Sequence, residues 1–350
     1  MDFLDGQRKP IKSDDRKGEK RLYPYYGASG IIDYIDEYIF DGDYILLSED
    51  GANIIDRNYR VAFIANGKIW VNNHAHVLQP HKEMNINFLS EALERINYAI
   101  YNTGTTMPKL NQEICRKINL NVPSLSEQNK IGNLLYLLNE RIATQNRLIE
   151  DLKKLSCAIV EKMFKQSKTN GRLGDFIEQV SVRNKNGLYS NVLSVSNKQG
   201  FVKQSEQFED RTVASEDTSN YKIVKRNNFA YNPARINVGS IARLTKFDVG
   251  IVSPMYVCFR TKDGIIPEYM EAFFTSQQFF YEMMKRLEGS VRLCLSYEGL
   301  CNIPVYIPNM NKQIVMGQNI SLILSKIGLE IEYLGRLHQQ KQYLLRKMFI

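Results

Sequence analysis

The sequence has few cysteines and lacks any apolar run long enough to suggest a membrane span. Its five cysteines are an odd number and include no Cys-x-x-Cys pair, which argues against a disulfide framework and favours a reducing compartment. No apolar stretch approaches the roughly 18 residues of a spanning helix. The first residues, MDFLDGQRKP, lack the apolar core of a signal peptide. We therefore expect a cytoplasmic protein without a membrane partner.

Motifs of catalysis and cofactor binding are also missing. There is no Walker A sequence and no Gly-x-Gly, so nothing indicates a glycine-rich phosphate-binding loop. The Asp/Asn-Pro-Pro-aromatic tetrapeptide of amino-methyltransferases does not occur, since Asn232-Pro233 is followed by Ala234. A nuclease core, Pro-Asp with a downstream acid-x-Lys, is absent too. The sequence therefore offers no recognisable motif for catalysis or for binding a cofactor.

Candidate metal ligands are sparse. His74 and His76 are two residues apart, so on a strand their side chains would share a face and could share a metal. No cysteine or carboxylate stands at ligand spacing beside them, and we predict no metal site. The acidic residues between 41 and 50 stand among turn residues, which favours a solvated loop. Cys294 and Cys301 are read as packed thiols.

The composition is that of a folded protein with a modest basic bias. Hydrophobic residues make up 43% and charged residues 24% of the 350 residues, which favours globular structure throughout. The length suggests two domains, at roughly 150 residues each. There are 46 Lys and Arg against 38 Asp and Glu, a formal net charge of +8, which suits a nucleic-acid partner without establishing one.

An internal repeat is the most informative feature of the sequence. Residues 103–164 align with residues 288–349 at a constant offset of 185 without a gap, and both copies end in Lys-Met-Phe. Two unrelated amphipathic helices would share leucines, but not the glycines, prolines and ending seen here. The sequence therefore predicts a true duplication. Identical pairs include Gly104/Gly289, Leu110/Leu295, Glu113/Glu298, Ile118/Ile303, Pro123/Pro308, Gln128/Gln313 and Gly132/Gly317.

Each copy of the repeat ends in a long predicted helix. Its apolar residues recur at three- and four-residue steps, a heptad-like seam interrupted at matching places by Gln145 and Glu330 and by Ser156 and Lys341. A lone helix would expose this stripe, so we expect the two helices to pack on each other. Packing on each helix's own domain or on a partner chain is the alternative. The seam residues are Ile131, Leu135, Leu138, Ile142, Ile149, Leu152, Ile159 and Met163, and Met316, Ile320, Ile323, Ile327, Leu334, Leu337, Leu344 and Met348.

The stretches before the repeats, 1–102 and about 171–287, read as mixed α/β bodies that differ from each other. The first holds the strand-like runs DYILLSED, RVAFIAN and KIWVNN, and the second NVLSVS, NNFAYNP, SIARLT and MYVCFRT. Asn66-Gly67 predicts a two-residue hairpin between the second and third runs, because both positions tolerate positive φ. Each body then finishes in an amphipathic helix, NINFLSEALERINYAIY or PEYMEAFFTSQQFFYEMMKRL.

Both bodies carry polar and basic residues that suit DNA. Residues 7–21 have a local charge of +4 and precede three tyrosines. In the second body, YNPARINVGSIAR places Arg235, Asn237 and Arg243 after a tight turn. Arg can bind guanine and Asn adenine with two hydrogen bonds, while Lys and Ser suit phosphates. A solvated charged loop beside core tyrosines is the alternative for the first stretch. The candidate DNA-contacting residues are Arg8, Lys9, Lys12, Tyr25, Tyr26, Ser29, Asn53, Asn73, His74, Ser196, Asn197, Lys198, Arg235, Asn237 and Arg243.

These stretches together give a resemblance to a known family. They are PYYGASGIIDYIDEYIFDGDYILLSEDGAN (24–53), WVNNHAHVL (70–78), YNPARINVGSIAR (231–243), LGDF (173–176), the Val/Ile-Pro-x4-Gln sequence entering each long helix, and the Lys-Met-Phe endings. Over nearly its full length the chain resembles the specificity (S) subunit of type I restriction–modification systems. The resemblance implies a non-catalytic subunit that binds double-stranded DNA, methyltransferase (M) subunits and restriction–translocation (R) subunits.

The resemblance also implies the domain organisation. It predicts a mixed α/β (α+β) fold in which two target recognition domains, each reading half of a split DNA target, are separated by two long antiparallel coiled-coil-like helices, with an internal pseudo-two-fold repeat. The expected parts are a first recognition domain at 1–120, a spacer helix at 121–168, a second recognition domain at 169–305 and a second spacer helix at 306–350. Under the offset of 185, Leu173 would match position −12, so the first domain is expected to lack the opening Leu-Gly-Asp segment.

Two other classes of function compete with this interpretation. A coiled-coil assembly or scaffold protein without DNA binding would self-associate and have no affinity for DNA. An enzyme acting on small molecules would need a deep polar pocket and a catalytic set, and the sequence offers none. A neighbouring gene for an adenine methyltransferase would favour the specificity subunit.

Overall fold

The structure, a computed structural model, describes residues 1–16, 20–165, 168–197, 199–204, 217–290 and 292–349. The chain divides into two compact units. Unit 1 comprises Met1–Asn146 and Tyr333–Ile350, and unit 2 comprises Arg147–Glu332. Each unit therefore combines one of the mixed α/β bodies with portions of both long helices. Lys198, one of the predicted DNA contacts, lies outside the described residues.

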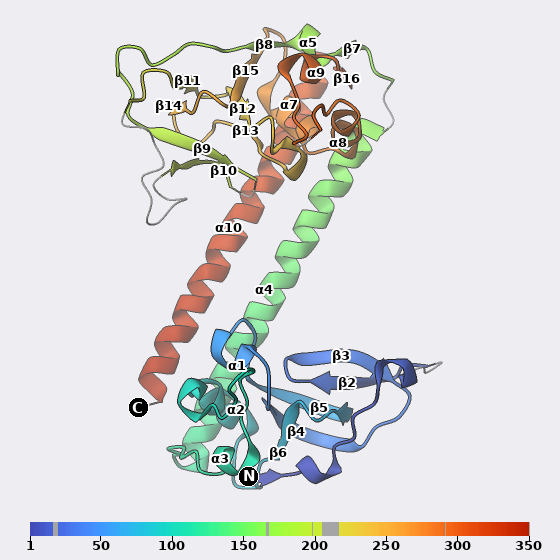
Figure 1. Cartoon of the computed structure of the whole chain (residues 1–350), viewed down its shortest axis with the longest axis vertical. Helices are drawn as coiled ribbons and strands as arrows, with labels where there is room; N and C mark the ends of the chain where they lie inside the picture. Colours follow the sequence, from blue (N-terminus) through green and yellow to red (C-terminus); the bar gives the residue numbers. More distant parts are fainter. Residues whose placement is uncertain (17–19, 166–167, 198, 205–216, 291, 350) are drawn as a thin grey trace. The chain divides into compact units, whose positions relative to one another are not determined.

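Unit 1 is built on a six-stranded sheet of order β1-β6-β4-β5-β2-β3 (Figure 1). The β2–β5 pair is parallel and the other neighbouring pairs are antiparallel. Helix α2 covers the sheet, placing Phe88 and Leu89 against Ile45 and Leu47 in the core. The strands are β1 (Asp2–Phe3), β2 (Tyr23–Gly27), β3 (Gly30–Ile35), β4 (Phe40–Ser48), β5 (Ala62–Val71) and β6 (Ala75–Gln79), and the helices are α1 (Asn53–Asp56), α2 (Ile86–Glu94) and α3 (Gln112–Cys115), with short 3-10 turns at Asp5–Gln7, Ser13–Asp15 and Tyr98–Tyr101.

The predicted hairpin at Asn66-Gly67 is wrong. Residues 62–71 form one continuous strand, β5, in which Asn66 pairs with Asp43 and Gly67 with Gly42 of β4. Gly67 does take the positive φ that the dipeptide suggested, at 75°. The chain distorts there without reversing, because β4 offers hydrogen-bond partners on both sides of the dipeptide.

Unit 2 contains two four-stranded sheets, of orders β10-β9-β14-β11 and β13-β12-β15-β8, and a short β16-β7 pair. Its largest core cluster is rich in phenylalanine and lies beneath α7 and α8. The strands are β7 (Gly171–Arg172), β8 (Ile177–Gln179), β9 (Val192–Ser196), β10 (Gly200–Lys203), β11 (Lys222–Lys225), β12 (Phe229–Tyr231), β13 (Ile241–Arg243), β14 (Val249–Val252), β15 (Val257–Thr261) and β16 (Pro304–Val305), and the helices are α5 (Leu173–Phe176), α7 (Pro267–Phe274), α8 (Gln277–Met284) and α9 (Tyr297–Cys301), with a 3-10 turn at Ile236–Val238.

The two units share one strand topology, although their sequences diverge. Strands β11 and β12 together take the place of β4, and β13 and β14 together that of β5, so the single sheet of unit 1 is split in unit 2. The split falls next to Asn227, whose φ of 68° turns the chain between β11 and β12. Backbone bonds after the central strand also correspond, from Leu110 to Glu49 (2.7 Å) and from Leu295 to Pro233 (3.1 Å). The duplication thus extends beyond the gapless repeat.

Two long helices follow the bodies: α4 (Leu125–Lys165, 41 residues) and α10 (Met310–Met348, 39 residues). All sixteen seam residues are buried or half-buried, as their spacing predicts. Within unit 1 the helices run antiparallel, because Asn139 and Lys341 both contact Glu91 while Arg141 lies 5.4 Å from the ring of Tyr333. The mixed α/β fold class with two long antiparallel helices is therefore confirmed.

The Pro-x4-Gln sequence fastens the start of each long helix to its body. Gln128 accepts a hydrogen bond from Asn85 N (3.0 Å) and donates one to Pro123 O (2.9 Å). Gln313 makes the corresponding pair with Ile266 N (3.0 Å) and Pro308 O (2.9 Å). Both amides are buried, so losing either would leave unpaired polar groups in the core. This explains why the motif occurs in both copies of the repeat.

One helix departs from the expectation that no segment suits a membrane. By length and composition α10 could cross one, since an 18-residue window has a mean hydropathy of 1.3. A long helix with an apolar seam inside a protein has the same composition. Ile320 and Ile327 of this helix are buried within the protein, as a seam requires.

Candidate nucleic-acid interface

Three loops meet at one edge of the sheet in unit 1. They are the β2–β3 turn around Ser29, the segment that follows β4, and the β5–β6 turn. Ser48 Oγ donates to Ala28 O (2.6 Å), and Glu49 N donates to His74 O (2.9 Å). Ser29, Asn73 and His74 are exposed at this edge. The structure thus brings together three predicted residues that are up to 45 positions apart in the sequence.

The corresponding loops meet in unit 2. The β9–β10 turn, the loop 232–240 after β12 and the turn before β15 come together, with Ser240 Oγ donating to Val195 O (3.1 Å). Arg235 and Asn197 are exposed, while Asn237 and Ser196 are half-buried. A cavity of about 630 Å³ opens beside Arg235 and is lined further by Asn232, Met255, Tyr256 and Arg292. This cavity offers cationic, amide and aromatic groups in one place.

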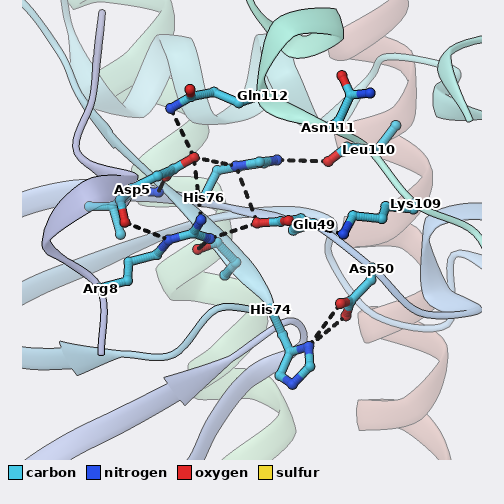
Figure 2. Close-up of polar contacts among 12 residues, drawn as sticks. Asp5, Arg8, Glu49, Asp50, His74, His76, Lys109, Leu110, Asn111 and Gln112 are labelled. Carbon is cyan, nitrogen blue, oxygen red and sulfur yellow. Dashed lines mark hydrogen bonds and ion pairs between the residues drawn. The ribbon is translucent and has the colours of Figure 1, made fainter. Parts of the chain in front are cut away.

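Behind the edge of unit 1 lies a buried ionic cluster, which Figure 2 shows. His76 Nδ1 is 2.6 Å from Asp5 Oδ2, and its Nε2 is 2.8 Å from Leu110 O. Arg8 donates to Glu49 Oε2 (2.7 Å) and to Ala75 O (2.8 Å). The cluster fastens the first eight residues to the sheet. Arg8, predicted to contact DNA, therefore has a structural role, because its side chain is only 13% exposed and its guanidinium is paired inside the domain.

The same cluster determines the pKa of His76. Burial lowers the pKa of His76, but the bonds to Asp5, Cys115 and Leu110 outweigh it and raise the pKa to about 10. The pKa of Asp5 is lowered, because His76, the Val77 amide and Arg8 outweigh the effect of burial.

Ligand atoms of Asp5, Glu49 and His76 lie close enough to hold a metal. However, Arg8 already supplies the positive charge at Glu49, so the donor set fits an ion pair better than a metal. His74 pairs with Asp50 at 2.8 Å and not with His76.

Three further predicted residues have structural roles. Tyr25 is buried, and its Oη accepts a hydrogen bond from Ile11 N (2.9 Å). The Asn53 amide bonds both the N–H and the carbonyl of Tyr59, at 2.7 and 3.0 Å. Arg243 is buried in ion pairs with Glu268 and Glu271 of α7. These side chains are engaged in contacts within their own domains, so we leave them out of the candidate interface.

The remaining predicted residues are more accessible. Lys9 and Lys12 are exposed on the segment before β2, while Tyr26 is half-buried. Burial and the neighbouring Tyr34 raise the pKa of Tyr26, which keeps its phenol protonated at neutral pH.

Sequence reasoning missed two cations at these edges. Lys109 is half-exposed, 3.5 Å from Glu49, and Arg292 lines the cavity beside Arg235. Both lie on corresponding loops, which are closed by Thr103 N to Lys109 O (2.8 Å) and Glu288 N to Cys294 O (2.9 Å). The duplication could have identified these two loops as equivalent. Nothing in the sequence showed that they lie beside residues 50–60 positions away.

Comparison with known proteins agrees with this architecture. Residues 2–154 match the family model described as type I restriction modification DNA specificity domain. A Haemophilus influenzae protein named as a type I restriction enzyme specificity subunit is 35% identical over 133 residues, which are 38% of this chain and 34% of that protein. A Mycoplasma pneumoniae type I specificity subunit is 32% identical over 146 residues, 40% of this chain and 38% of that protein. These matches cover about a third of the relatives' length.

A solved structure extends the likeness in fold. The S subunit of a type I restriction–modification system from M. genitalium superposes with a TM-score of 0.67, covering 100% of this chain and 95% of that one at 17% identity. The fold of a specificity subunit thus spans the whole chain. Residues 2–154 thus match the type I DNA specificity domain, and the chain as a whole shares the fold of a solved S subunit.

Proposed function

We propose that this chain is the sequence-specific DNA-binding subunit of a type I restriction–modification complex. The observation that carries the proposal is that both units gather exposed polar loops at equivalent edges of one shared topology while their residues differ. Two units that share a topology but carry different side chains on their loops would suit a DNA target made of two different halves. The chain itself would be non-catalytic, cofactor-free and cytoplasmic.

Base contacts in the proposal come from loop residues that are exposed or, for Asn237, half-buried. Arg235 and Asn237 would read the half-site of unit 2, and Asn73 and His74 that of unit 1. Arg can form two hydrogen bonds with guanine and Asn two with adenine. Lys9, Lys12, Ser29, Ser196 and Asn197 would contact phosphates and so position the domains without selecting sequence. Binding should then weaken steeply with salt as counterions are released.

The long helices support the second part of the proposal, docking of methyltransferase and restriction subunits. Helix α10 exposes Val315, Leu322 and Leu329, a row with a seven-residue period distinct from the buried seam. A row of this period is what a partner helix would cover. Leu137, the counterpart of Leu322 under the repeat, is also exposed on α4. We expect methyltransferase subunits to cover these faces and restriction subunits to join them. The proposed recognition domains are 1–120 and 169–305, with 121–168 and 306–350 as spacers.

A methylome tests the proposal. The chain is co-expressed with its cognate methyltransferase in an unmethylated host, and modified adenines are mapped by single-molecule sequencing. We expect a split, asymmetric motif that appears only with this chain. A symmetric motif would mean that one domain reads and two chains pair. No modification, together with self-association and no DNA affinity, would favour a scaffold protein instead.

Replacing Arg235 with alanine sharpens the test. The motif should relax in one half only, because the loop of unit 2 would read that half. Arg260→Ala is a matched control, since Arg260 is also exposed in unit 2 but pairs with Glu178 away from the loops. A change in both halves with Arg235→Ala would contradict modular reading.

A further inference from the structure

A short closed loop follows each mixed α/β body and belongs to the gapless repeat. It comprises residues 103–109 in unit 1 and 288–294 in unit 2, where residue 291 lies outside the described part of the chain. In unit 1, Thr103 N donates to Lys109 O (2.8 Å). In unit 2, Glu288 and Cys294 exchange two backbone hydrogen bonds, of 2.9 and 2.8 Å. Both loops are therefore fixed at their base.

A glycine at the same position sets the backbone path inside both loops. A Cβ at Gly104 would collide with Met107 O, and a Cβ at Gly289 would collide with Arg292 O. Gly289 also has a φ of 116°, which glycine adopts readily. Each glycine stands three residues before the residue whose carbonyl it contacts. Met107 and Arg292, which we call the tip residues, therefore occupy the same place in two loops of similar shape.

The loop of unit 1 lies against the candidate interface. Gly51 N donates to Pro108 O (3.0 Å), which ties the loop to the segment that follows β4. The neighbouring Asp50 pairs with the exposed His74 at 2.8 Å. Met107 directly precedes Pro108 and is 54% exposed. An exposed apolar side chain therefore lies on the same edge of the sheet as His74.

The loop of unit 2 lies against the equivalent edge. Leu295 N, directly after the loop, donates to Pro233 O (3.1 Å), and Arg292 lines the cavity of about 630 Å³ together with Arg235. Both arginines are exposed, and among the described residues neither has an ion-pair partner. Two cations lining one cavity repel each other, so the cavity favours a ligand rich in hydrogen-bond acceptors. Guanine presents two acceptors in the major groove, N7 and O6, which one arginine can bind together.

We propose that the two tip residues are specificity-determining residues, one for each half-site. Arg292 binds a guanine in the half-site of unit 2, and Met107 makes an apolar contact with a thymine methyl group in the half-site of unit 1. This inference rests on the proposed DNA-binding function. A phosphate contact would need a hydrogen-bond donor at the tip of both loops, because the DNA backbone is the same in both half-sites. A methionine in one loop and an arginine in the other are what two different base contacts require.

Exchanging the tip residues tests the inference. Arg292→Met and Met107→Arg are made separately in the full chain, each variant is co-expressed with the cognate methyltransferase, and modified adenines are mapped. Arg292→Met should remove a guanine preference at one position, in the same half-site that Arg235→Ala relaxes. Met107→Arg should change one position in the other half-site. In competition binding of the complex to duplexes that differ only at the first position, Arg292→Met should lower the preference for guanine roughly five- to hundredfold.

Matched controls make the same exchanges outside the loops. Arg260→Met removes an exposed arginine of unit 2 that pairs with Glu178, and Met310→Arg alters a methionine that is 42% exposed at the start of α10. Both should leave the motif unchanged.

The wild-type motif separates this inference from the proposed function. A split motif that neither tip exchange alters leaves the proposed function standing and overturns only the role of the loops. An even loss of modification at all sites with Arg292→Met also overturns it, because that result indicates a phosphate contact. A wild-type chain that directs no modification refutes the proposed function and this inference with it.

Discussion

Single residues show most directly why the two copies of the repeat have identical residues at certain positions. Gly132 lies where α4 approaches the start of α2, and a Cβ there would be 2.2 Å from Asn85 Oδ1, the group that caps α2. The equivalent Gly317 would place a Cβ 2.7 Å from Glu268 Cβ of α7. Both glycines are therefore required by close approach, which the sequence could indicate only as an unexplained identity between the two copies.

Replacing Gly132 with alanine should lower the free energy of unfolding by about 1–3 kcal/mol, the usual cost of forcing atoms into a packed site. Denaturant unfolding of the full chain measures the change. Gly328→Ala is the matched control, since this helix glycine has open space around its Cα. That variant should gain roughly 0.5–1 kcal/mol. Equal gains in both variants would mean that helix propensity, and not the close contact at Gly132, decides the outcome.

His76 makes the stability of unit 1 depend on pH. Its folded pKa of about 10 lies above the ordinary value of 6.5, because the bonds to Asp5 and its neighbours outweigh burial. The stabilisation is therefore fully present below pH 6.5 and is lost as pH rises toward 10. Unfolding free energies of wild type and His76→Gln, compared from pH 6 to 10, should converge at high pH. A constant difference would show that the imidazole is buried neutral.

At the scale of elements, one buried carboxylate joins three helices of unit 1. Glu91 of α2 is 3% exposed and contacts Arg60 (2.6 Å), Asn139 of α4 (2.8 Å) and Lys341 of α10 (3.2 Å). Burial raises the pKa of Glu91, but Arg60 and Lys341 outweigh it and hold the pKa below its ordinary value. The lysine that interrupts the predicted seam thus has a partner on another element.

Glu91→Ala should cost about 3–5 kcal/mol, since it leaves Lys341 and Arg60 without their counter-charge. Adding Lys341→Met should recover part of this loss, because the unpaired ammonium is then replaced by an apolar chain. Denaturant unfolding of the single and double variants measures the coupling. If the losses simply add, the pair is not an interacting unit.

The elements also show what sequence reasoning reaches and where it stops. Periodicity predicts both long helices and their buried seams, because each signal lies within one segment. The split of the unit 2 sheet escapes it, since a positive φ at Asn227 is not written in any local pattern. Only part of the candidate site could be predicted from the sequence. Ser29, Asn73, His74 and Arg235 are exposed, as a DNA contact requires. Tyr25 and Arg243 are buried, and the burial of Arg243 depends on tertiary partners such as Glu271.

At the scale of the whole molecule, α4 continues without a break from unit 1 into unit 2 at Arg147. If the chain reads a split target, we expect the lengths of this helix and of α10 to set the spacing of the half-sites. The repeat identifies the matching point on α10, since Arg147 aligns with Glu332. Both helices can therefore be lengthened at equivalent places.

Inserting four helical residues after Arg147 and four after Glu332 adds about 6 Å to each helix, or roughly two base-pair steps of DNA. The methylome of this variant should show an unchanged sequence in both half-sites and a spacer longer by one or two base pairs. Insertion after Arg147 alone puts the two seams out of step, so it should reduce or abolish modification. The recognition loops and the inserted residues lie on different elements, so the insertion should not affect the half-sites. Altered half-sites with an unaltered spacer would therefore refute the idea that helix length sets the spacing.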